Sequence, residues 1–128
     1  VIAMIIKESA ENYLESILML QRKKGYARSV DVAAQLNFSK ASVSVAMKRF
    51  RSDGYVEMDA AGNLTLTEKG RQIAEKMFER HEMIARGLIA LGVAEDVAYE
   101  DSCKIEHDLS DISFEKIKEH LKKKGVIA

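Results

Sequence analysis

Residues 29–67 read SVDVAAQLNFSKASVSVAMKRFRSDGYVEMDAAGNLTLT. Ser29 can cap a short helix that extends to about Leu36, and the polar stretch that follows predicts a tight turn. Ser39 can then cap a second helix, which stops at Asp53-Gly54. The apolar residues of this second helix recur at i, i+3, i+4 and i+7, a spacing typical of a core-facing stripe: Val43, Ala46, Met47 and Phe50.

The segments on either side complete an order of elements. Residues 55–58 and 64–67 flank a turn rich in Gly and Asn, which predicts a β-hairpin. Upstream, residues 7–22 carry apolar side chains at the spacing of an amphipathic helix. The order helix, short helix, turn, helix, hairpin is that of a winged helix-turn-helix, in which the second helix of the pair enters the major groove of DNA.

The face of residues 39–51 opposite the apolar stripe suits this role. Small side chains allow the helix to approach base edges, hydroxyl groups can bind bases or phosphates, and Val45 can touch a thymine methyl group. Basic side chains and the helix N-terminus attract phosphate. The candidate DNA contacts are Arg28, Ser39, Lys40, Ala41, Ser42, Ser44, Val45, Lys48, Arg49 and Arg51. The alternative is an ordinary surface helix of an unrelated bundle.

Charge is distributed unevenly although 20 Lys and Arg residues balance 20 Asp and Glu residues. Residues 22–53 hold eight basic and two acidic residues, whereas residues 95–115 hold eight acidic residues and one lysine. Either these are two solvated faces, or a polyanion-binding lobe precedes a cation-binding lobe.

Two further features exclude broad classes of protein. The single cysteine excludes a secreted disulfide scaffold and favours the reducing cytoplasm. The longest apolar run, Val1–Ile6, is too short to span a bilayer and has no signal-peptide pattern, so we expect no membrane association.

The C-terminal half is predicted to be helical throughout. A long helix over residues 68–91 carries Ile73, Met77, Ile84, Leu88 and Leu91 on one face. Two more helices are expected over residues 95–109 and 112–124, the last with Phe114, Ile117 and Leu121 directed inward.

Cys103, Glu106 and His107 lie at i, i+3 and i+4 of the predicted helix 95–109. Side chains at this spacing can converge on one point, and thiolate, carboxylate and imidazole are all ligands of first-row metal ions. Taken alone, the trio is better explained as a buried Cys beside a surface Glu and a surface His.

His81 on the apolar stripe and Asn12 and Glu15 on the first helix add coordinating groups from two other helices. Each has an ordinary explanation, as a core histidine or as surface polar residues. Together they favour a metal site, because burying such groups without a cation is costly.

Several stretches together resemble the diphtheria-toxin-repressor and manganese-transport-regulator family. They are residues 9–15, 29–55 and 64–70, Arg80-His81 and residues 105–110. The resemblance covers about residues 7–123 and implies a mainly α fold with two domains. A winged helix-turn-helix over residues 1–70 binds a palindromic operator, and a helical domain over residues 71–128 dimerises and binds Fe(II) or Mn(II) as co-repressor.

The resemblance also implies a ligand set. Cys103, Glu106 and His107 match the main metal site, and Asn12 takes the first-helix position at which iron sensors have Met and manganese sensors have Asp. Glu15 and His81 match the second metal position of the manganese branch. That branch has a bridging Glu where this chain has Cys103, and the ancillary site of the iron branch lacks its acid and histidine, because Ala85 and Tyr99 stand there. The ligand set is therefore a hybrid.

The expected function is that of a cytoplasmic, metal-dependent repressor that binds double-stranded operator DNA as a homodimer. It would have no small-molecule substrate and the short, two-domain form without an SH3-like domain. The thiolate of Cys103 slightly favours Fe(II) over Mn(II) as the expected metal, and Zn(II), Co(II) or Ni(II) could bind in vitro. One alternative is a winged-helix regulator that senses a small organic ligand. A metal enzyme is disfavoured because no substrate pocket or poised base is evident.

Overall fold

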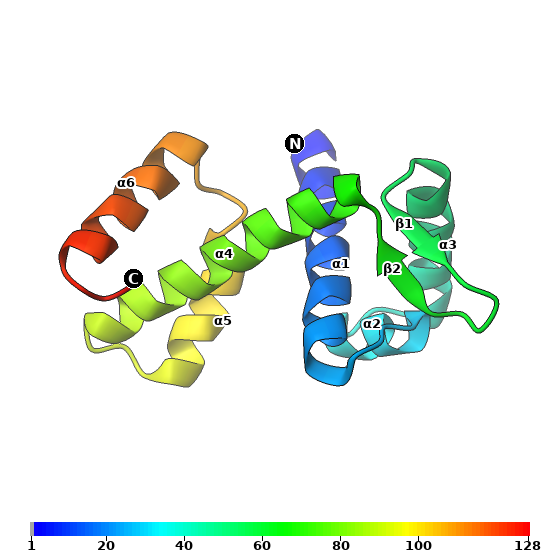
Figure 1. Cartoon of the computed structure of the whole chain (residues 1–128), viewed down its shortest axis with the longest axis horizontal. Coiled ribbons are helices and arrows are strands. Elements are labelled where there is room, and N and C mark those ends of the chain that lie inside the picture. Colours follow the sequence, from blue (N-terminus) through cyan, green and yellow to red (C-terminus); the bar gives the residue numbers. More distant parts are fainter. Residues whose placement is uncertain (1) are drawn as a thin grey trace. The chain divides into compact units, whose positions relative to one another are not determined.

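The structure, a computed structural model, describes the backbone of residues 2–128 and the side chains of residues 8–128. The side chains of the apolar run Val1–Ile6 therefore lie outside the described residues. The described chain is mainly α, as expected, with one small hairpin (Figure 1). The elements are α1 (Ile2–Lys24), α2 (Ser29–Leu36), α3 (Lys40–Ser52), β1 (Val56–Met58), β2 (Leu64–Leu66), α4 (Glu68–Ala90), α5 (Glu95–Ile105) and α6 (Asp111–Lys123).

The chain divides into two compact units, Val1–Lys76 and Met77–Ala128. The division falls inside α4, so the first turns of this helix belong to one unit and its remainder to the other. Each unit has its own buried apolar residues and is described separately below.

The first unit is a winged helix-turn-helix. Helices α1, α2 and α3 pack around a core of fully buried aliphatic side chains, which includes Ile17, Val32, Val43 and Met47. The hairpin contacts α1 through β2 and α3 through β1. Figure 1 shows this wing beside α3, the helix expected to read DNA. The fold expected for this region is therefore confirmed.

Capping residues define the turn between α2 and α3. Asn37 ends α2 in the left-handed conformation with φ 57°, and the Ser39 side chain accepts a hydrogen bond from the Ser42 amide at the start of α3. The expected cap of α2 was wrong, because Arg28 is the N-cap and Ser29 is the first helical residue. Asp31 takes over the capping role, since its carboxylate accepts a hydrogen bond from the Arg28 amide at 3.2 Å.

The wing is a short antiparallel hairpin in which Val56 pairs with Leu66 and Met58 with Leu64. The Asp59 carboxylate holds its turn by accepting hydrogen bonds from the amides of Asn63 and Ala61, each at 2.9 Å. These bonds, first of all the one from Asn63, lower the pKa of Asp59. The tip of the wing therefore carries a fixed negative charge.

The start of α4 is pressed against the end of the helix-turn-helix. A Cβ atom on Gly70 would lie 2.1 Å from the backbone oxygen of Tyr55, so only glycine fits there. Thr67 caps α4 by accepting a bond from the Gly70 amide and donates its hydroxyl proton to the Gly54 oxygen.

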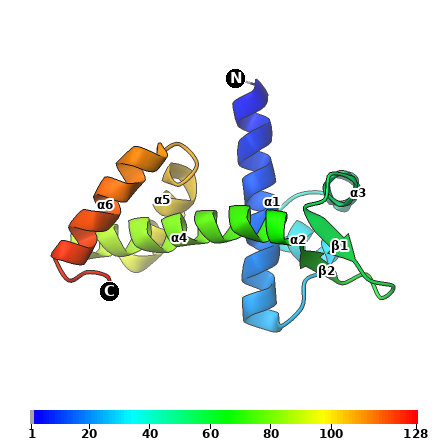
Figure 2. The ribbon, with the colours of Figure 1, turned by 45° about the horizontal axis from the view of Figure 1, so that its top comes forward.

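The second unit packs α5 and α6 along the remainder of α4, as Figure 2 also shows. Met77, Ile84, Ala98, Phe114 and Leu121 form its core. Helix α5 ends at Ile105, four residues before the predicted end. Two residues expected to face inward do not: Leu91 is 83% exposed and Ile117 is 37% exposed.

Among the described residues, no helix combines the length and the apolar character needed to cross a membrane.

Candidate metal centre and nucleic-acid interface

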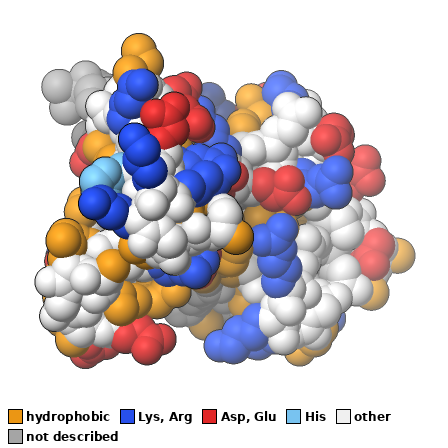
Figure 3. All heavy atoms as spheres, turned by 60° about the vertical axis from the view of Figure 1, so that its left-hand side comes forward, with side chains coloured by type: hydrophobic (Ala, Val, Ile, Leu, Met, Phe, Trp, Pro, Cys, Tyr) orange, Lys and Arg blue, Asp and Glu red, His pale blue; other side chains and the backbone are white. Residues whose placement is uncertain are grey.

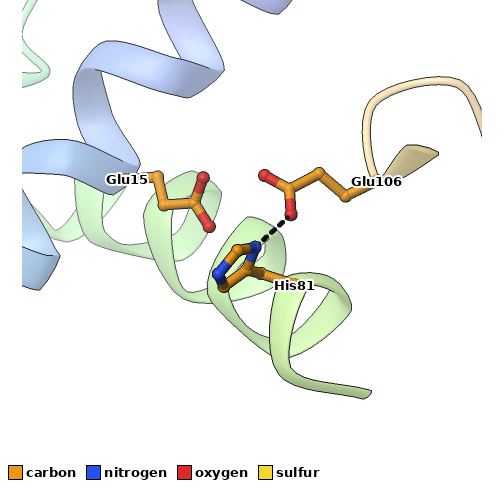
Figure 4. A group of neighbouring side chains, drawn as sticks. All are labelled: Glu15, His81 and Glu106. Atoms are coloured by element: carbon orange, nitrogen blue, oxygen red, sulfur yellow. Dashed lines mark hydrogen bonds and ion pairs between the residues drawn. The ribbon is translucent and has the colours of Figure 1, made fainter. Parts of the chain in front are cut away.

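His81 lies at the centre of a polar cluster in the second unit. Its Nδ1 atom is 2.9 Å from the Ser102 hydroxyl, 3.0 Å from Oε2 of Glu106 and 3.6 Å from Sγ of Cys103. Figure 4 shows His81 and Glu106 directed toward each other, with their hydrogen bond dashed. His81 comes from α4 and the other three come from α5 and its C-cap, so two segments about 20 residues apart meet here.

Ser102 fixes the direction of one of these hydrogen bonds. Its hydroxyl donates to the backbone oxygen of Tyr99 at 3.2 Å, so the hydroxyl oxygen accepts from Nδ1–H of His81. Ser102 is completely buried, and nothing in the sequence pattern pointed to it.

Glu106 is completely buried and offers a second oxygen to the site. Its Oε1 atom accepts no hydrogen bond from the described residues, and Nε2 of His107 lies 3.4 Å away. A buried carboxylate oxygen without a donor is unfavourable unless a cation approaches it. The donor set of thiol, carboxylate and two imidazoles fits a divalent transition metal ion.

The protonation of His81 reflects this cluster. Burial by itself lowers the pKa of an imidazole, but the hydrogen bonds to Cys103 and Glu106 favour the charged ring, and together they raise the pKa of His81 to about 10. A metal ion that coordinates His81 at neutral pH would therefore displace a proton from the ring.

Glu106 and His107 do not lie on the same regular helix as Cys103, contrary to expectation. Helix α5 ends at Ile105, Glu106 is its C-cap and His107 belongs to the following turn. The C-cap keeps helical dihedral angles of −57° and −30°. Sγ of Cys103 lies 3.6 Å from Nδ1 of His81, and Nε2 of His107 lies 3.4 Å from Oε1 of Glu106.

Asn12 and Glu15 lie three residues apart on α1, in the first unit, and thus on one side of that helix. Figure 4 also labels Glu15. His120 is exposed near the end of α6. His120 lies near Lys116, Lys122 and Lys123 of the same helix, and Figure 3 shows basic side chains beside a histidine on one face of the molecule.

The candidate DNA contacts all lie on the exposed surface of the first unit. Val45 is 71% exposed although it is apolar, and its neighbours Ser44 and Lys48 are exposed on the same side of α3. The Ser39 side chain caps α3 by accepting a hydrogen bond from the Ser42 amide, and Nε of Arg49 lies 3.9 Å from Oδ2 of Asp53. Both side chains therefore already interact within the protein. The exposed face of α3 therefore carries side chains that are small, weakly apolar or basic.

Arg28 lies apart from α3, where the start of α2 meets the wing. Its backbone forms a β-bridge with Asn63, and a Cβ atom on Gly62 would lie 3.2 Å from its guanidinium. The guanidinium therefore lies over the turn of the wing.

Two family models match the chain almost end to end. The model of the iron-dependent repressor N-terminal DNA-binding domain matches residues 6–64, and that of the iron-dependent repressor metal-binding and dimerisation domain matches residues 67–124. The chain belongs to the iron-dependent repressor family. The expected family is thus confirmed, and with it the expected class of function: this repressor is a metal-dependent transcriptional regulator and not an enzyme.

Curated relatives agree with this assignment. The repressor is 37% identical over 109 residues to the HTH-type transcriptional regulator MntR of Lysinibacillus sphaericus, a match that covers 85% of this chain and 78% of the relative. It is 38% identical over 109 residues to MntR of Bacillus subtilis, with 85% and 77% of the two chains covered.

Solved structures share the fold of the repressor. T. acidophilum IdeR has a TM-score of 0.79 at 26% identity, and a manganese-dependent transcriptional repressor in complex with manganese has a TM-score of 0.81 at 26% identity. Both matches cover 88% of this chain but only 53% and 52% of the solved chains, so the repressor spans about half their length.

Proposed function

We propose that this repressor binds a palindromic DNA operator as a homodimer when Fe(II) or Mn(II) occupies the centre around His81. The observation that carries the proposal is the cluster in which the buried side chains of His81 and Glu106 meet the exposed Cys103. Its Glu106 Oε1 atom has no hydrogen-bond donor among the described residues.

We assign the ligands to the cluster and to the first helix. Cys103, Glu106, His107 and His81 supply one thiolate, one carboxylate and two imidazoles from the second unit. Asn12 and Glu15 join them, because they match the first-helix ligand positions of the family that the chain resembles. A bound divalent ion supplies the positive charge that makes this set of buried acidic groups favourable.

The ligands also carry the proposed switch. Asn12 and Glu15 belong to the first unit, which includes the candidate DNA-reading helix, and the other four belong to the second. Coordination by residues of both units restricts their relative motion, which favours the DNA-binding arrangement by a few kcal/mol.

The thiol of Cys103 favours Fe(II) over Mn(II), because manganese prefers oxygen ligands. Zn(II), Co(II) and Ni(II) also suit the set in vitro. The location in the cytoplasm, expected from the single cysteine, stays a prediction.

The dimer has a candidate interface in the second unit. An apolar groove of about 670 Å³ is lined mainly by residues of α4 and α6, by the end of α5 and by residues that follow these helices, among them Ile117 of α6 and Leu91 just after α4. Leu91 at 83% exposed is an unfavourable surface residue in a monomer, and the matched family domain is described as a dimerisation domain. We infer that a second copy of the chain covers this groove.

The test is a DNA-binding titration by fluorescence anisotropy, with the dimer state recorded by analytical ultracentrifugation. Purified protein is treated with chelator and then titrated anaerobically with Fe(II), Mn(II) or Zn(II). We expect chelation to weaken specific binding at least tenfold and Fe(II) or Mn(II) to restore it. Specific binding unchanged by chelator and by added metal would contradict the proposal and direct attention to a small organic effector.

A further inference from the structure

Arg80 is a buried cation that the proposed ligand set does not use. Its side chain is 4% exposed, and it lies next to His81 on α4. One terminal nitrogen donates to the backbone oxygens of Glu106 at 2.9 Å and Leu109 at 2.6 Å, and the other donates to Oδ1 of Asp111 at 2.6 Å. All of these partners belong to the second unit.

The position of this guanidinium matters because of where α5 ends. Beyond Ile105 no regular helix holds the chain until α6 begins at Asp111. The last carbonyl groups of a helix have no partners within it, and a cation close to them is favourable. Arg80 supplies donors and charge at this point.

We propose that Arg80 is a positioning residue for the metal centre: it holds the turn 106–109 so that the carboxylate of Glu106 faces His81 and the imidazole of His107 lies beside that carboxylate. This inference rests on the proposed function, since it takes Glu106 and His107 to be metal ligands. The turn of α4 that carries the proposed ligand His81 thus also carries Arg80, which positions the proposed ligands Glu106 and His107.

The guanidinium geometry is what the turn requires. Its planar fork reaches two carbonyl oxygens and one carboxylate at once, whereas the single ammonium of a lysine cannot reproduce these directions. A buried arginine adds little net stability compared with a well-packed apolar side chain. Its Nε atom has no hydrogen-bond partner among the described residues, so the site is not optimised for stability alone.

The test compares Mn(II) affinities of full-length variants, measured from the electron paramagnetic resonance signal of free Mn(II). Arg80→Lys keeps the positive charge but removes the planar pair of terminal nitrogens of the guanidinium. We expect this variant to bind Mn(II) about 10- to 100-fold more weakly than wild type. Asp111→Asn weakens only one of the three interactions, and we expect a loss of about threefold. Asp111→Asn also keeps the inference testable if Arg80→Lys does not fold.

Two control variants separate positioning from general damage. Arg86→Lys changes another arginine of α4 that donates to a backbone oxygen, that of Val126, away from the ligands. Leu121→Ala removes a buried core side chain of α6 that is not a hydrogen-bond partner of Arg80, and it lowers the unfolding temperature. We expect both to bind Mn(II) within twofold of wild type at a temperature at which circular dichroism shows every variant folded.

The outcomes distinguish failure of the positioning role of Arg80 from failure of the proposed metal site. A wild-type chain that binds no Mn(II) overturns the proposed metal site, and this inference falls with it. Tight binding by wild type together with unchanged affinity in folded Arg80→Lys, or in Asp111→Asn if only that variant folds, overturns the positioning role alone. An equal loss in Leu121→Ala also overturns it, because the effect would then follow stability.

Discussion

The Nδ1 atom of His81 lies 3.0 Å from Oε2 of Glu106, although 25 residues separate them in the chain. Both side chains are buried, and the hydrogen bond to Glu106 is one of the interactions that raise the pKa of His81 to about 10. This relationship sets the expected response of the repressor to metal, to pH and to substitution.

Glu106→Gln should lower the affinity for Fe(II) and Mn(II) at least tenfold, because it removes a ligand charge from a buried site. Isothermal titration calorimetry measures the loss. Glu100→Gln is the matched control, since Glu100 is exposed on α5 and only 4.0 Å from Lys104 in a surface pair. Equal affinities in the two variants would exclude Glu106 as a ligand.

Metal affinity should rise with pH. The pKa of His81 is raised to about 10, so the ring is protonated at neutral pH and must lose a proton when it coordinates a metal ion. Below this pKa, the apparent affinity should increase about tenfold per pH unit for each proton released. Mn(II) titrations in chelator-treated protein between about pH 6 and pH 8 measure the slope, and a flat profile would show that His81 is not a ligand.

Cys103→Glu should shift the response from Fe(II) toward Mn(II), because a carboxylate is a harder ligand than a thiolate. The measurement is the ratio of the two metal affinities in wild type and variant, obtained anaerobically. The ratio rather than either affinity is decisive, since the substitution also adds charge. Should the relative affinity for Mn(II) fail to rise, Cys103 does not select the metal.

Lys48→Ala should weaken DNA binding similarly for specific and unrelated sequences and reduce the salt slope of log K by about one, the signature of one lost phosphate contact. Lys48 is exposed on α3 beside Ser44 and Val45. Lys116→Ala, on the exposed face of α6, serves as the control with the same change of charge. If both variants lose affinity equally, only net charge matters and α3 is not the DNA-reading helix.

Leu91→Asp should convert the dimer to a monomer, because it places a charge on the apolar groove of the second unit. Sedimentation velocity measures the change, and Leu91 is 83% exposed in the single chain, so the fold itself should tolerate the substitution. Val45→Asp, another exposed apolar position that lies on α3 instead, provides the comparison. A dimer that persists in Leu91→Asp would place the interface elsewhere.

Much of the first unit could be predicted from the sequence, because short-range interactions determine it. Ser39 caps α3 as its position suggested, and the stripe that includes Val43 and Met47 is buried. The error at α2, where Arg28 is the cap in place of Ser29, is one residue wide. It arose because Asp31 supplies the capping carboxylate from within the helix.

The second unit was predicted less accurately. The helical periodicity of residues 95–109 continues past Ile105, but the backbone leaves the helix there and the carbonyl groups of Glu106 and Leu109 bind Arg80. No local sequence pattern predicts that the Glu106 carbonyl group accepts a hydrogen bond from Arg80, which lies 26 residues upstream. Leu91 and Ile117 fit the apolar stripes of their helices equally well, yet they lie on the surface of the single chain.

The sequence by itself determined the order of helices, the wing, the unequal charge of the two halves and the residue types able to hold a metal ion, because periodicity, capping and side-chain chemistry are local properties. Only the tertiary structure decided which of those groups meet. The approach of Glu106 to His81, the buried hydroxyl of Ser102 and the hold of Arg80 on the turn depend on α4 and α5 packing side by side. Such packing is the sum of many weak contacts over the whole unit, and no single stretch of sequence specifies it.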